Sequence, residues 1–547
     1  MRKTFLFKVA AIAFVLLFPA MNVMQAGFIS ARTITGTVVD DADDEPLAFA
    51  TVQIEGTSKG ATTDINGRFT IDANDGQTLV VTYVGYVTQR IPVSGQSTLT
   101  IRMKEDSQLL SEVVVVGYGV MQKKLVTGAT VQVKGADVQK LNTTSPLQAL
   151  QGQTPGMAII STSGQPGEGL KVNIRGLGTT GDSGPLYIID GVRGDINTLN
   201  PADIESIDIL KDAASAAIYG SQSANGVVLI TTKNGKEGKA VVSFDGYMGW
   251  QNVARKAKML NSQQYMTIMD EQNVNSGGLP YDWSKYTSIY DADGKVYDTD
   301  WVDQMFKSNA KLQSYTLGVS GGNAKQNYAL SLGYMSQEGI VGGSSVSNYE
   351  RYNFRLNAEQ NVIDNFLKIG EQVGFVYSKT RGISVGNQYN NTLRSAFGTS
   401  PLAPVYSDNN IYDSPYNDTS NSDWYNGDGN PYGAMMTTVN NKSKNAYFTG
   451  NVYAEMEFIK DLKFRSTFGA RYSSTDYRSF RPLYHFSIYS YNDTRTEAAQ
   501  SKGDGWELTW TNTLNYKFDV AEDHHFDALL GMESFRTQGS SLYARNG

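Results

Sequence analysis

Two short motifs in the 547-residue chain have the residue types and spacing of known binding sites. GLGTTG, residues 176–181, matches the G-x-G-x-x-G pattern that holds a dinucleotide pyrophosphate. That chemistry requires a helix N-terminus directly after the glycines, but the next residues, DSGPLYIID, indicate a turn and a strand. DADGKVYD, Asp291–Asp298, resembles a calcium loop but has its glycine in the wrong place for an EF-hand. We interpret the first motif as a glycine-rich structural loop and the second as a turn.

The remaining composition argues against catalysis. The chain has no cysteine, which excludes disulfides, thiolate metal sites and cysteine nucleophiles. Histidine occurs only at His485, His524 and His525, so His-Ser or His-metal chemistry is disfavoured over everything before them. We find no nucleophile elbow and no phosphate loop. The sequence therefore predicts a protein that is not an enzyme, with no cofactor and no metal. Its net charge of −7 gives no reason to expect nucleic acid.

Residues 1–26 have the pattern of a signal peptide. Arg2, Lys3 and Lys8 precede the apolar run Val9–Phe18, which is too short to cross a bilayer. We expect cleavage after Ala26. Beyond it, no apolar run approaches the roughly 20 residues of a membrane helix. The sequence thus predicts an exported protein without helical membrane spans.

The next two regions differ in pattern. Residues 33–104 contain short alternating runs such as ITGTVVD and TLVVTYVGY, with a hairpin signal at Asn66-Gly67, and predict a β-sandwich. Residues 125–236 are mixed α/β. SPLQALQG predicts a helix with Ser145 as its cap, and Asn200-Pro201 predicts the start of another. AASAAIYG suggests a small-residue helix, whereas MAIIS, LKVNIRG, GPLYIIDG and ANGVVLITTK suggest strands.

Residues 240–547 show long, strictly alternating strands. NYALSLGYM, for example, places Tyr328, Leu330, Leu332 and Tyr334 on one face. We count nine such strands, mostly of about 10–14 residues, against about 5–6 in soluble sheets. The connections alternate between long and tight, which is typical of transmembrane β-barrels and not of sandwiches. The odd count and the ending GSSLYARNG, which is no closing strand, lead us to expect a truncated barrel.

The segment EVVVVGYG, residues 112–119, places apolar side chains on both faces of a strand although its flanks have the composition of a linker. Such a strand makes sense if it pairs with the sheet edge of another protein, where main-chain hydrogen bonds supply affinity. The alternative is a strand stored in the core of a neighbouring domain. The two arrangements can also alternate.

These residues resemble a known family. SEVVVVGYGVMQKK is similar to the segment that opens SusC/RagA-type TonB-dependent outer-membrane transporters. The similarity continues from ALQGQTPGMAIIS through IRGLGTTGDSGPLYIIDGVRG to GVVLITTKNG, which resembles the plug domain of that family. GTVVDDADDEPLAFATVQIEG resembles the carboxypeptidase regulatory-like module. The expected fold class is therefore mainly β: an N-terminal β-sandwich, an α/β plug domain and a truncated transmembrane antiparallel β-barrel.

The resemblance implies the domain order and the function. The domains are a signal peptide (1–26), a regulatory-like β-sandwich (33–104), a TonB box segment (111–124), a plug (125–236) and a partial barrel (240–547). The family implies a barrel of about 22 strands and TonB-dependent import of an oligosaccharide, or else of a peptide, across the Gram-negative outer membrane, with the N-terminal domains in the periplasm. It implies TonB and a SusD-like surface lipoprotein as partners. The alternative function is a soluble, multi-domain β surface or adhesion protein without transport.

The sequence offers two sets of site residues. By resemblance, the TonB-binding residues are Glu112, Val113, Val114, Val115, Val116, Gly117 and Tyr118. The loop Thr380–Ser443 is rich in aromatic and amide side chains, which suit sugars. Our candidates for substrate contact there are Tyr412, Tyr416, Trp424 and Tyr425. We favour the alternative that this loop packs on its neighbours or on the lipoprotein.

Overall fold

The chain forms two compact units, Met1–Val113 and Val114–Gly547. The computed structural model describes residues 32–41, 44–57, 59–83, 86–104, 113–116, 119–122, 130–141, 143–176, 181, 183–212, 216, 219–220, 223–386, 391–414, 429–520 and 524–547, with side chains except in 113–122 and at 130. The predicted signal peptide, most of AASAAIYG and the centre of GLGTTG lie outside the described residues. No described helix is long and apolar enough to cross a membrane.

The first unit is a β-sandwich. One sheet has the order β4-β1-β7 and the other β3-β2-β5-β6. Buried and exposed residues alternate along strands such as β4, so each sheet turns one face toward a shared apolar core that includes Ile34, Val52, Phe69 and Leu79. The strands are β1 (Arg32–Asp40), β2 (Thr51–Ile54), β3 (Gly60–Thr62), β4 (Arg68–Ala73), β5 (Thr78–Thr82), β6 (Gln89–Pro92) and β7 (Thr98–Met103).

The turn at Asn66-Gly67 differs from the hairpin that the sequence suggests. Gly67 has a φ of 70°, and Asp64 Oδ1 accepts the amides of Asn66 and Arg68 at 2.9 and 2.8 Å. The turn joins β3 to β4, which belong to different sheets. The dipeptide therefore makes a tight turn that passes the chain from one sheet of the sandwich to the other.

The second unit begins with strands and short helices that form an α/β layer, here called the plug. Its main sheet has the order β10-β15-β16-β13-β14, and β11 and β12 form a separate pair. The two helices and both sheets share one apolar core, which includes Val133, Leu147, Ile159, Ile207 and Ile230. The elements are β10 (Thr130–Lys134), α2 (Gly135–Lys140), α3 (Pro146–Leu150), β11 (Met157–Ser161), β12 (Leu170–Ile174), β13 (Leu186–Ile189), β14 (Val192–Arg193), η2 (Ile196–Thr198), η3 (Pro201–Asp203), β15 (Ile204–Leu210) and β16 (Val227–Thr232).

Helix α3 confirms its predicted start, because Ser145 Oγ accepts the amide of Leu147 and Pro146 occupies the first turn. The helix predicted from Asn200-Pro201 is wrong. Asn200 does cap a turn, but that turn is the three-residue 3₁₀ helix η3, and β15 begins directly after it. The residues that would have continued the helix, Ile204–Leu210, instead form β15, which pairs with β10 on one side and β16 on the other.

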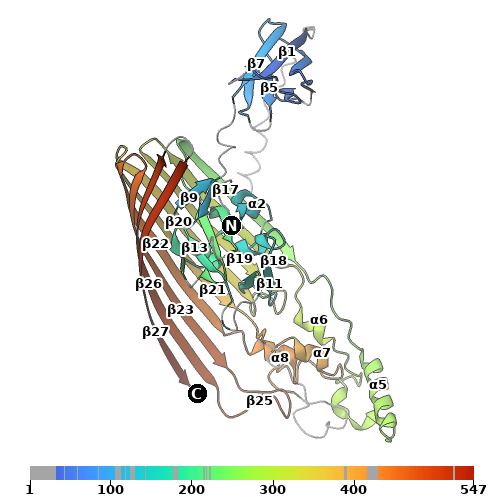
Figure 1. Cartoon of the computed structure of the whole chain (residues 1–547). Helices are drawn as coiled ribbons and strands as arrows, with labels where there is room; N and C mark the ends of the chain where they lie inside the picture. The colour runs from blue at the N-terminus through green and yellow to red at the C-terminus, as the bar shows by residue number, and fades with distance from the viewer. Residues whose placement is uncertain are drawn as a thin grey trace, which may run out of the picture. The chain divides into compact units, whose positions relative to one another are not determined.

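The largest part of the second unit, within the described residues, is one antiparallel sheet in which nine strands follow one another in the order β17-β18-β19-β20-β21-β22-β23-β26-β27. Figure 1 shows the sheet curving beside the plug elements. The strands have 13 to 24 residues, longer than the sequence suggested. They are β17 (Gly238–Gln251), β18 (Ala310–Gly322), β19 (Gln326–Glu338), β20 (Asn348–Ile363), β21 (Leu367–Arg381), β22 (Lys442–Ile459), β23 (Leu462–Arg481), β26 (Glu497–Val520) and β27 (His524–Asn546).

One face of this sheet is apolar, as the alternation predicts. Tyr328, Leu330, Leu332 and Tyr334 share it on β19. Tyrosines form a row across four adjacent strands, with ring centroids 6.5, 5.1 and 6.4 Å apart: Tyr315, Tyr334, Tyr352 and Tyr377. A second aromatic group, Tyr516, Phe518 and Phe526, lies near the end of β26 and the start of β27. The opposite face of the sheet is polar and meets the plug.

The connections alternate as predicted. Tight turns join β18 to β19, β20 to β21 and β22 to β23, and three residues separate β26 from β27. The long connections carry the helices at the other end of the sheet (Figure 1). The long connections pack into a core of their own, where Trp301 donates its indole N–H to the carbonyl of Ser400 at 2.9 Å. Their elements are α5 (Ser262–Asn275), η5 (Trp283–Lys285), η6 (Thr287–Ile289), α6 (Trp301–Met305), α7 (Arg394–Gly398), α8 (Pro431–Met436), β24 (Tyr484–His485) and β25 (Tyr491–Asn492).

Candidate functional site: the interface between the plug and the sheet

The plug-facing side of β20 carries a row of hydrogen-bonding side chains. Every second residue from Arg351 to Asn357 turns toward the plug, because side chains alternate along a strand. Arg351 donates to the carbonyl of Asn197 at 3.1 Å, and Asn353 donates to the carbonyl of Thr198 at 2.9 Å. A single strand of the sheet thus fixes the backbone of the turn η2.

Asp190 is the centre of the strongest attachment. It occupies the turn between β13 and β14 with a φ of 49°, and its carboxylate accepts the amide and the hydroxyl of Thr232, each at 2.8 Å. The same carboxylate forms an ion pair with Arg355 of β20. Both side chains are largely buried. Removing one of them would therefore leave the charge of the other buried and uncompensated. Asn357 adds hydrogen bonds to the hydroxyl of Thr232 and the carbonyl of Lys233, at 2.7 and 2.8 Å.

The hairpin β13–β14 also reaches strands farther along the sheet. A Cβ on Gly469 of β23 would come within 2.9 Å of the Val192 side chain, so this glycine provides the space that Val192 occupies. Arg193 lies 3.6 Å from Glu533 and stacks over the ring of Phe535 at 4.4 Å, both on β27. The hairpin therefore contacts β20, β23 and β27 at once.

A second attachment lies around η3. Asn200 donates to Thr316 Oγ1 of β18 at 2.9 Å, and Ser331 of β19 donates to Asp203 Oδ1 at 2.6 Å. Burial raises the pKa of Asp203, while the Ser331 hydroxyl and the positive charges of Arg355, Lys233 and Arg351 oppose that rise. A buried carboxylate that is costly to charge thus sits at the contact between plug and sheet.

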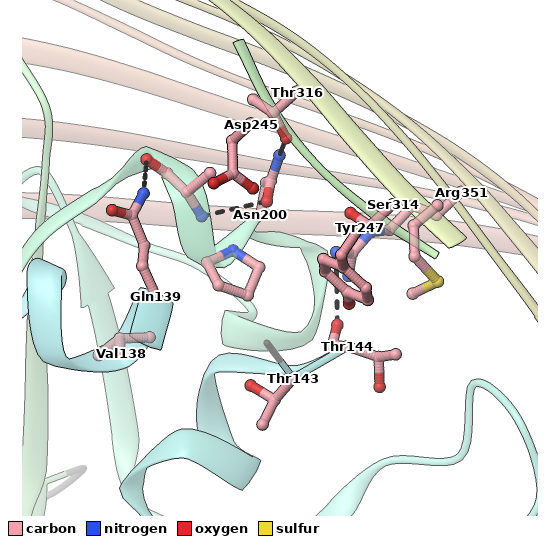
Figure 2. A pocket seen from close by; sticks show the side chains of 13 residues that line it. Val138, Gln139, Thr143, Thr144, Asn200, Asp245, Tyr247, Ser314, Thr316 and Arg351 are labelled. Carbon is pink, nitrogen blue, oxygen red and sulfur yellow. Dashed lines mark hydrogen bonds between the residues drawn. The ribbon is translucent and has the colours of Figure 1, made fainter. Parts of the chain in front are cut away.

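Two cavities lie between the plug and strands β17–β19. The larger has a volume of about 590 Å³ and is lined by polar groups of both regions, including Asp203, Lys233, Ser243 and Arg355. The smaller, about 30 Å³, is shown in Figure 2. Beside it, Gln139 donates to the carbonyl of Ala202 and Asn200 donates to Thr316 Oγ1. Gln139 and Ala202 line both cavities, so this part of the plug lies between them.

A third cavity, of about 120 Å³, lies between the sheet and the other side of the plug. Hydroxyl and amide groups dominate its lining, with Tyr349 and Arg351 on the sheet side. Gln165 at its rim accepts the amide of Ile383 at 2.8 Å, which ties the plug to one of the long connections. Its chemistry suits a solute with many hydrogen-bonding groups. Among the described residues no cluster of three metal-ligating side chains occurs.

The structure describes part of the predicted sites. Val113–Val116 form β8, which pairs with β9 (Gly119–Gln122) in a two-stranded sheet. Glu112, Gly117 and Tyr118 lie outside the described residues, as do Tyr416, Trp424 and Tyr425. Tyr412 is half-buried, and its carbonyl accepts the amide of His485 at 2.7 Å. Its role in substrate contact stays a prediction.

Other residues of the loop Thr380–Ser443 pack against the connection between β17 and β18, which is the arrangement that we favoured. Leu402 and Met435 are buried in the core with Trp301. DADGKVYD is the predicted turn, because Asp291 Oδ1 accepts the amides of Asp293 and Lys295 at 3.0 and 2.8 Å.

Sequence reasoning missed the row on β20 and its partner Asp190. The signal was the alternation in YERYNFRLN, where Arg351, Asn353, Arg355 and Asn357 replace the apolar residues that a buried strand face would carry. A polar face on a long strand indicates a surface that contacts water or forms hydrogen bonds with another part of the protein. The Asp-Gly pair after LYII is a turn signal, and it indicated the β13–β14 turn that places Asp190 beside β20.

The sequence of this chain is similar to known protein families and to individual curated proteins. Residues 34–115 match the CarboxypepD_reg-like domain, and residues 122–227 match the TonB-dependent Receptor Plug Domain. The chain is 30% identical to TonB-dependent receptor SusC of Bacteroides thetaiotaomicron over 95% of its own length and 52% of that protein. It is 32% identical to TonB-dependent receptor P26 of Formosa agariphila, over 92% of the chain and 49% of that protein. The chain thus spans about half the length of the curated relatives it matches.

A solved structure is similar to this chain over most of its length. The RagAB peptide importer in its open-open state superimposes with a TM-score of 0.65 at 26% identity, covering 79% of this chain and 50% of that one. Over the matched part, the fold of this chain is therefore similar to that of a protein whose solved structure is described as a peptide importer.

Proposed function

The chain is a homologue of SusC/RagA-type TonB-dependent receptors, and we propose that it takes part in TonB-energised import of a nutrient across the outer membrane. The observation that carries this proposal is the plug itself. It is held against the polar face of the sheet by hydrogen bonds and by the ion pair of Asp190 and Arg355, and the short apolar strand β8 precedes it in the chain. Polar contacts can be exchanged for water when the plug moves, and a strand offers a handle for pulling.

The sheet face that points away from the plug supports placement in a membrane. Leu332 is 48% exposed, Val452 50% and Trp510 48%, although soluble sheets cover such side chains. The tyrosine row across β18–β21 suits one membrane interface, and the aromatic group where β26 ends and β27 begins suits the other. In this orientation the tight turns face the periplasm, and the long connections with their helices face the outside.

The partners follow from the same orientation. TonB would pair with β8 in the periplasm, through the segment Glu112–Tyr118. A SusD-like lipoprotein would cover the long connections, in line with the name of the structural neighbour, RagAB. The substrate we propose is an oligosaccharide, with a peptide as the alternative, because both offer hydrogen-bonding groups to the hydroxyl- and amide-lined cavity near Gln165. The named relatives are receptors, which agrees with the absence of catalytic motifs in the sequence.

The test is a proline in β8 of the intact protein. Val114→Pro removes a ladder N–H and fixes φ, so the strand can no longer pair along its length. We expect energised uptake of the substrate to be lost while assembly in the outer membrane and surface binding persist. Val114→Ile is the matched control, because it keeps a β-branched residue and should transport normally. Normal uptake by Val114→Pro would show that β8 is not the segment that pairs with TonB, whereas the absence of uptake by the unmodified protein would favour the surface or adhesion protein without transport.

A further inference from the structure

Arg351 of β20 carries a buried positive charge. The residue is only 3% exposed. Its guanidinium donates to two backbone carbonyls, that of Asn197 at 3.1 Å and that of Thr144 at 3.5 Å (Figure 2). Its Nε atom is buried and has no hydrogen-bond partner. In the described part of the chain no carboxylate lies within ion-pair distance of Arg351, whereas Arg355 on the same face of β20 pairs with Asp190.

This difference between two arginines on one strand face points to an absent anion. A buried charge is costly unless an opposite charge and hydrogen bonds compensate it. The two carbonyls offer Arg351 hydrogen bonds but no negative charge. The buried carboxylate of Asp203 interacts with Arg351 only at longer range, and its own hydrogen bond is with Ser331. Arg355 is therefore compensated within the chain, and Arg351 is not.

Arg351 lines the cavity of about 120 Å³ between the plug and the sheet. Tyr349 lines it from the same face of β20, and Gln165 at its rim is bonded to Ile383, so the cavity lies toward the end of the sheet that carries the long connections. Glu168 also lines it but is exposed and forms no ion pair with Arg351 among the described residues. The hydroxyl and amide groups of the lining come from Thr144, Ser145, Gln148, Ser161, Ser163, Gln165, Asn197 and Gln337.

We propose that Arg351 binds a carboxylate group of the imported solute in this cavity. The Nε and Nη2 hydrogens lie on one side of the planar guanidinium, in a fork that matches the two oxygens of a carboxylate. Nε has no partner, and Nη2 has only the long bond to Thr144, so this fork is the part of Arg351 that can accept an anion. The surrounding hydroxyls and amides can bind the polar groups beside the carboxylate.

The inference rests on the proposed import function and narrows its substrate to an acidic one. The carboxylate belongs either to a uronic acid residue of an oligosaccharide or to a peptide. Both sources share the chemistry that Arg351 recognises, and competition experiments distinguish them.

The first experiment uses propionate and propionamide, which have the same shape but differ in charge. Saturation-transfer NMR of the probe's methyl signal, with the intact purified protein, detects weak binding. We expect a saturable signal with propionate and none with propionamide, and loss of the propionate signal in Arg351→Gln. Arg478→Gln is the matched control, because Arg478 is half-exposed and already paired with Asp476 at 3.4 Å. Equal signals from the two probes, or a propionate signal that persists in Arg351→Gln, would overturn the proposal.

A second variant tests the cavity without removing the bonds of Arg351. A Cβ on Gly164, which also lines the cavity, would meet no atom within 4 Å, so the fold accepts a side chain there. Gly164→Trp should weaken propionate binding by roughly tenfold or more, because the ring takes the place of the probe beside the charged donor. Hydrogen exchange of the η2 amides should stay unchanged, which shows that the attachment of Arg351 to Asn197 is intact. Unchanged propionate binding would place the probe elsewhere and contradict the site.

Competition against propionate identifies the source of the carboxylate. Trigalacturonate is compared with its fully methyl-esterified form, and trialanine with its C-terminal amide. Displacement by the acid form of one pair, and not by its neutral form, assigns the carboxylate to a sugar or to a peptide. Displacement by neither acid, or equally by the neutral forms, would overturn the assignment to the substrate.

Uptake is measured separately, so the two proposals can fail independently. If the unmodified protein imports no solute, the import function fails even where propionate binds. If it imports neutral solutes and propionate does not bind, the carboxylate site alone fails.

Discussion

The sandwich and the plug–sheet interface hold β-strands together by different means. In the sandwich, two sheets close over apolar side chains such as Ile34, Val52 and Leu79, all at most 2% exposed. The plug meets the sheet through carboxylate, amide and guanidinium groups. When two apolar surfaces separate, the favourable free energy of their burial is lost. When two polar surfaces separate, their groups form new hydrogen bonds with water, which offsets much of the cost. The first contact is suited to permanence and the second to separation.

The largest effect should come from the interface, where the ion pair is buried. Arg355→Met leaves Asp190 charged and without its partner, which costs about 3–5 kcal/mol of plug attachment. Hydrogen exchange of the β13 and β16 amides in the intact protein measures this loss as faster opening. The double variant Asp190→Asn with Arg355→Met removes both charges and should recover much of the protection. If Arg355→Met exchanged like the unmodified protein, the pair would not hold the plug.

The sandwich should respond to a cavity in its core. Leu79 is fully buried, so Leu79→Ala removes packing and costs about 2–5 kcal/mol of sandwich stability. Limited proteolysis should cut within residues 32–104 of the intact protein while the protection of the plug amides stays unchanged. Ile65→Ala, at a side chain 74% exposed, is the control and should have little effect. A loss of plug protection in Leu79→Ala would mean that the two regions are coupled.

A single neutral hydrogen bond at the interface should matter less. Asn353→Ala removes the donor to the carbonyl of Thr198 and costs about 1–3 kcal/mol, because the carbonyl is left without that partner. Hydrogen exchange around η2 should speed up by less than in Arg355→Met. Asn361→Ala, an exposed bond within the tight turns of the sheet, serves as the control and should leave η2 unchanged. An effect larger than that of Arg355→Met would reverse our ranking of the attachments.

The sequence predicted the strands of the sheet better than the contacts across it. Alternation with period two is a local signal, and so is the contrast between tight turns and long connections. Arg355 and Asp190 are 165 residues apart, and nothing local specifies that the β13 turn stops beside β20. The failed helix at Asn200-Pro201 has the same cause. Its cap was predicted correctly, but the pairing of β15 with distant strands made the residues after the cap extended.

The predicted binding residues show the same limit. Val113–Val116 are extended, as four β-branched residues favour, yet their pairing with β9 was not foreseen. The row on β20 could have been found, because polar residues alternate with aromatic ones in YERYNFR. Its partners could not, since they depend on how the plug is placed against the sheet.

The smallest effect concerns pH at Asp203. Burial raises the pKa of its carboxyl, so the attached plug binds the proton more tightly than a detached plug, in which the group returns toward its ordinary value near 3.8. The resulting stabilisation of the attached plug is fully present when the pH is below the ordinary pKa of the carboxyl. It is lost as the pH rises through the raised pKa of the attached state. The attachment should therefore tighten on acidification. Protonated Asp203 can keep its hydrogen bond with the Ser331 hydroxyl.

Asp203→Asn keeps the shape of this side chain but removes its titration. The amide of Lys233, which donates to the carbonyl of Asp203 at 2.8 Å, reports on the same contact. Its hydrogen exchange in the intact protein, compared with that of Asp203→Asn at each pH, cancels the ordinary pH dependence of exchange. We expect the ratio of the two protection factors to rise in favour of the unmodified protein as the pH falls. A constant ratio would show that Asp203 stays ionised at the interface, and that the charges of Arg355 and Lys233 outweigh its burial.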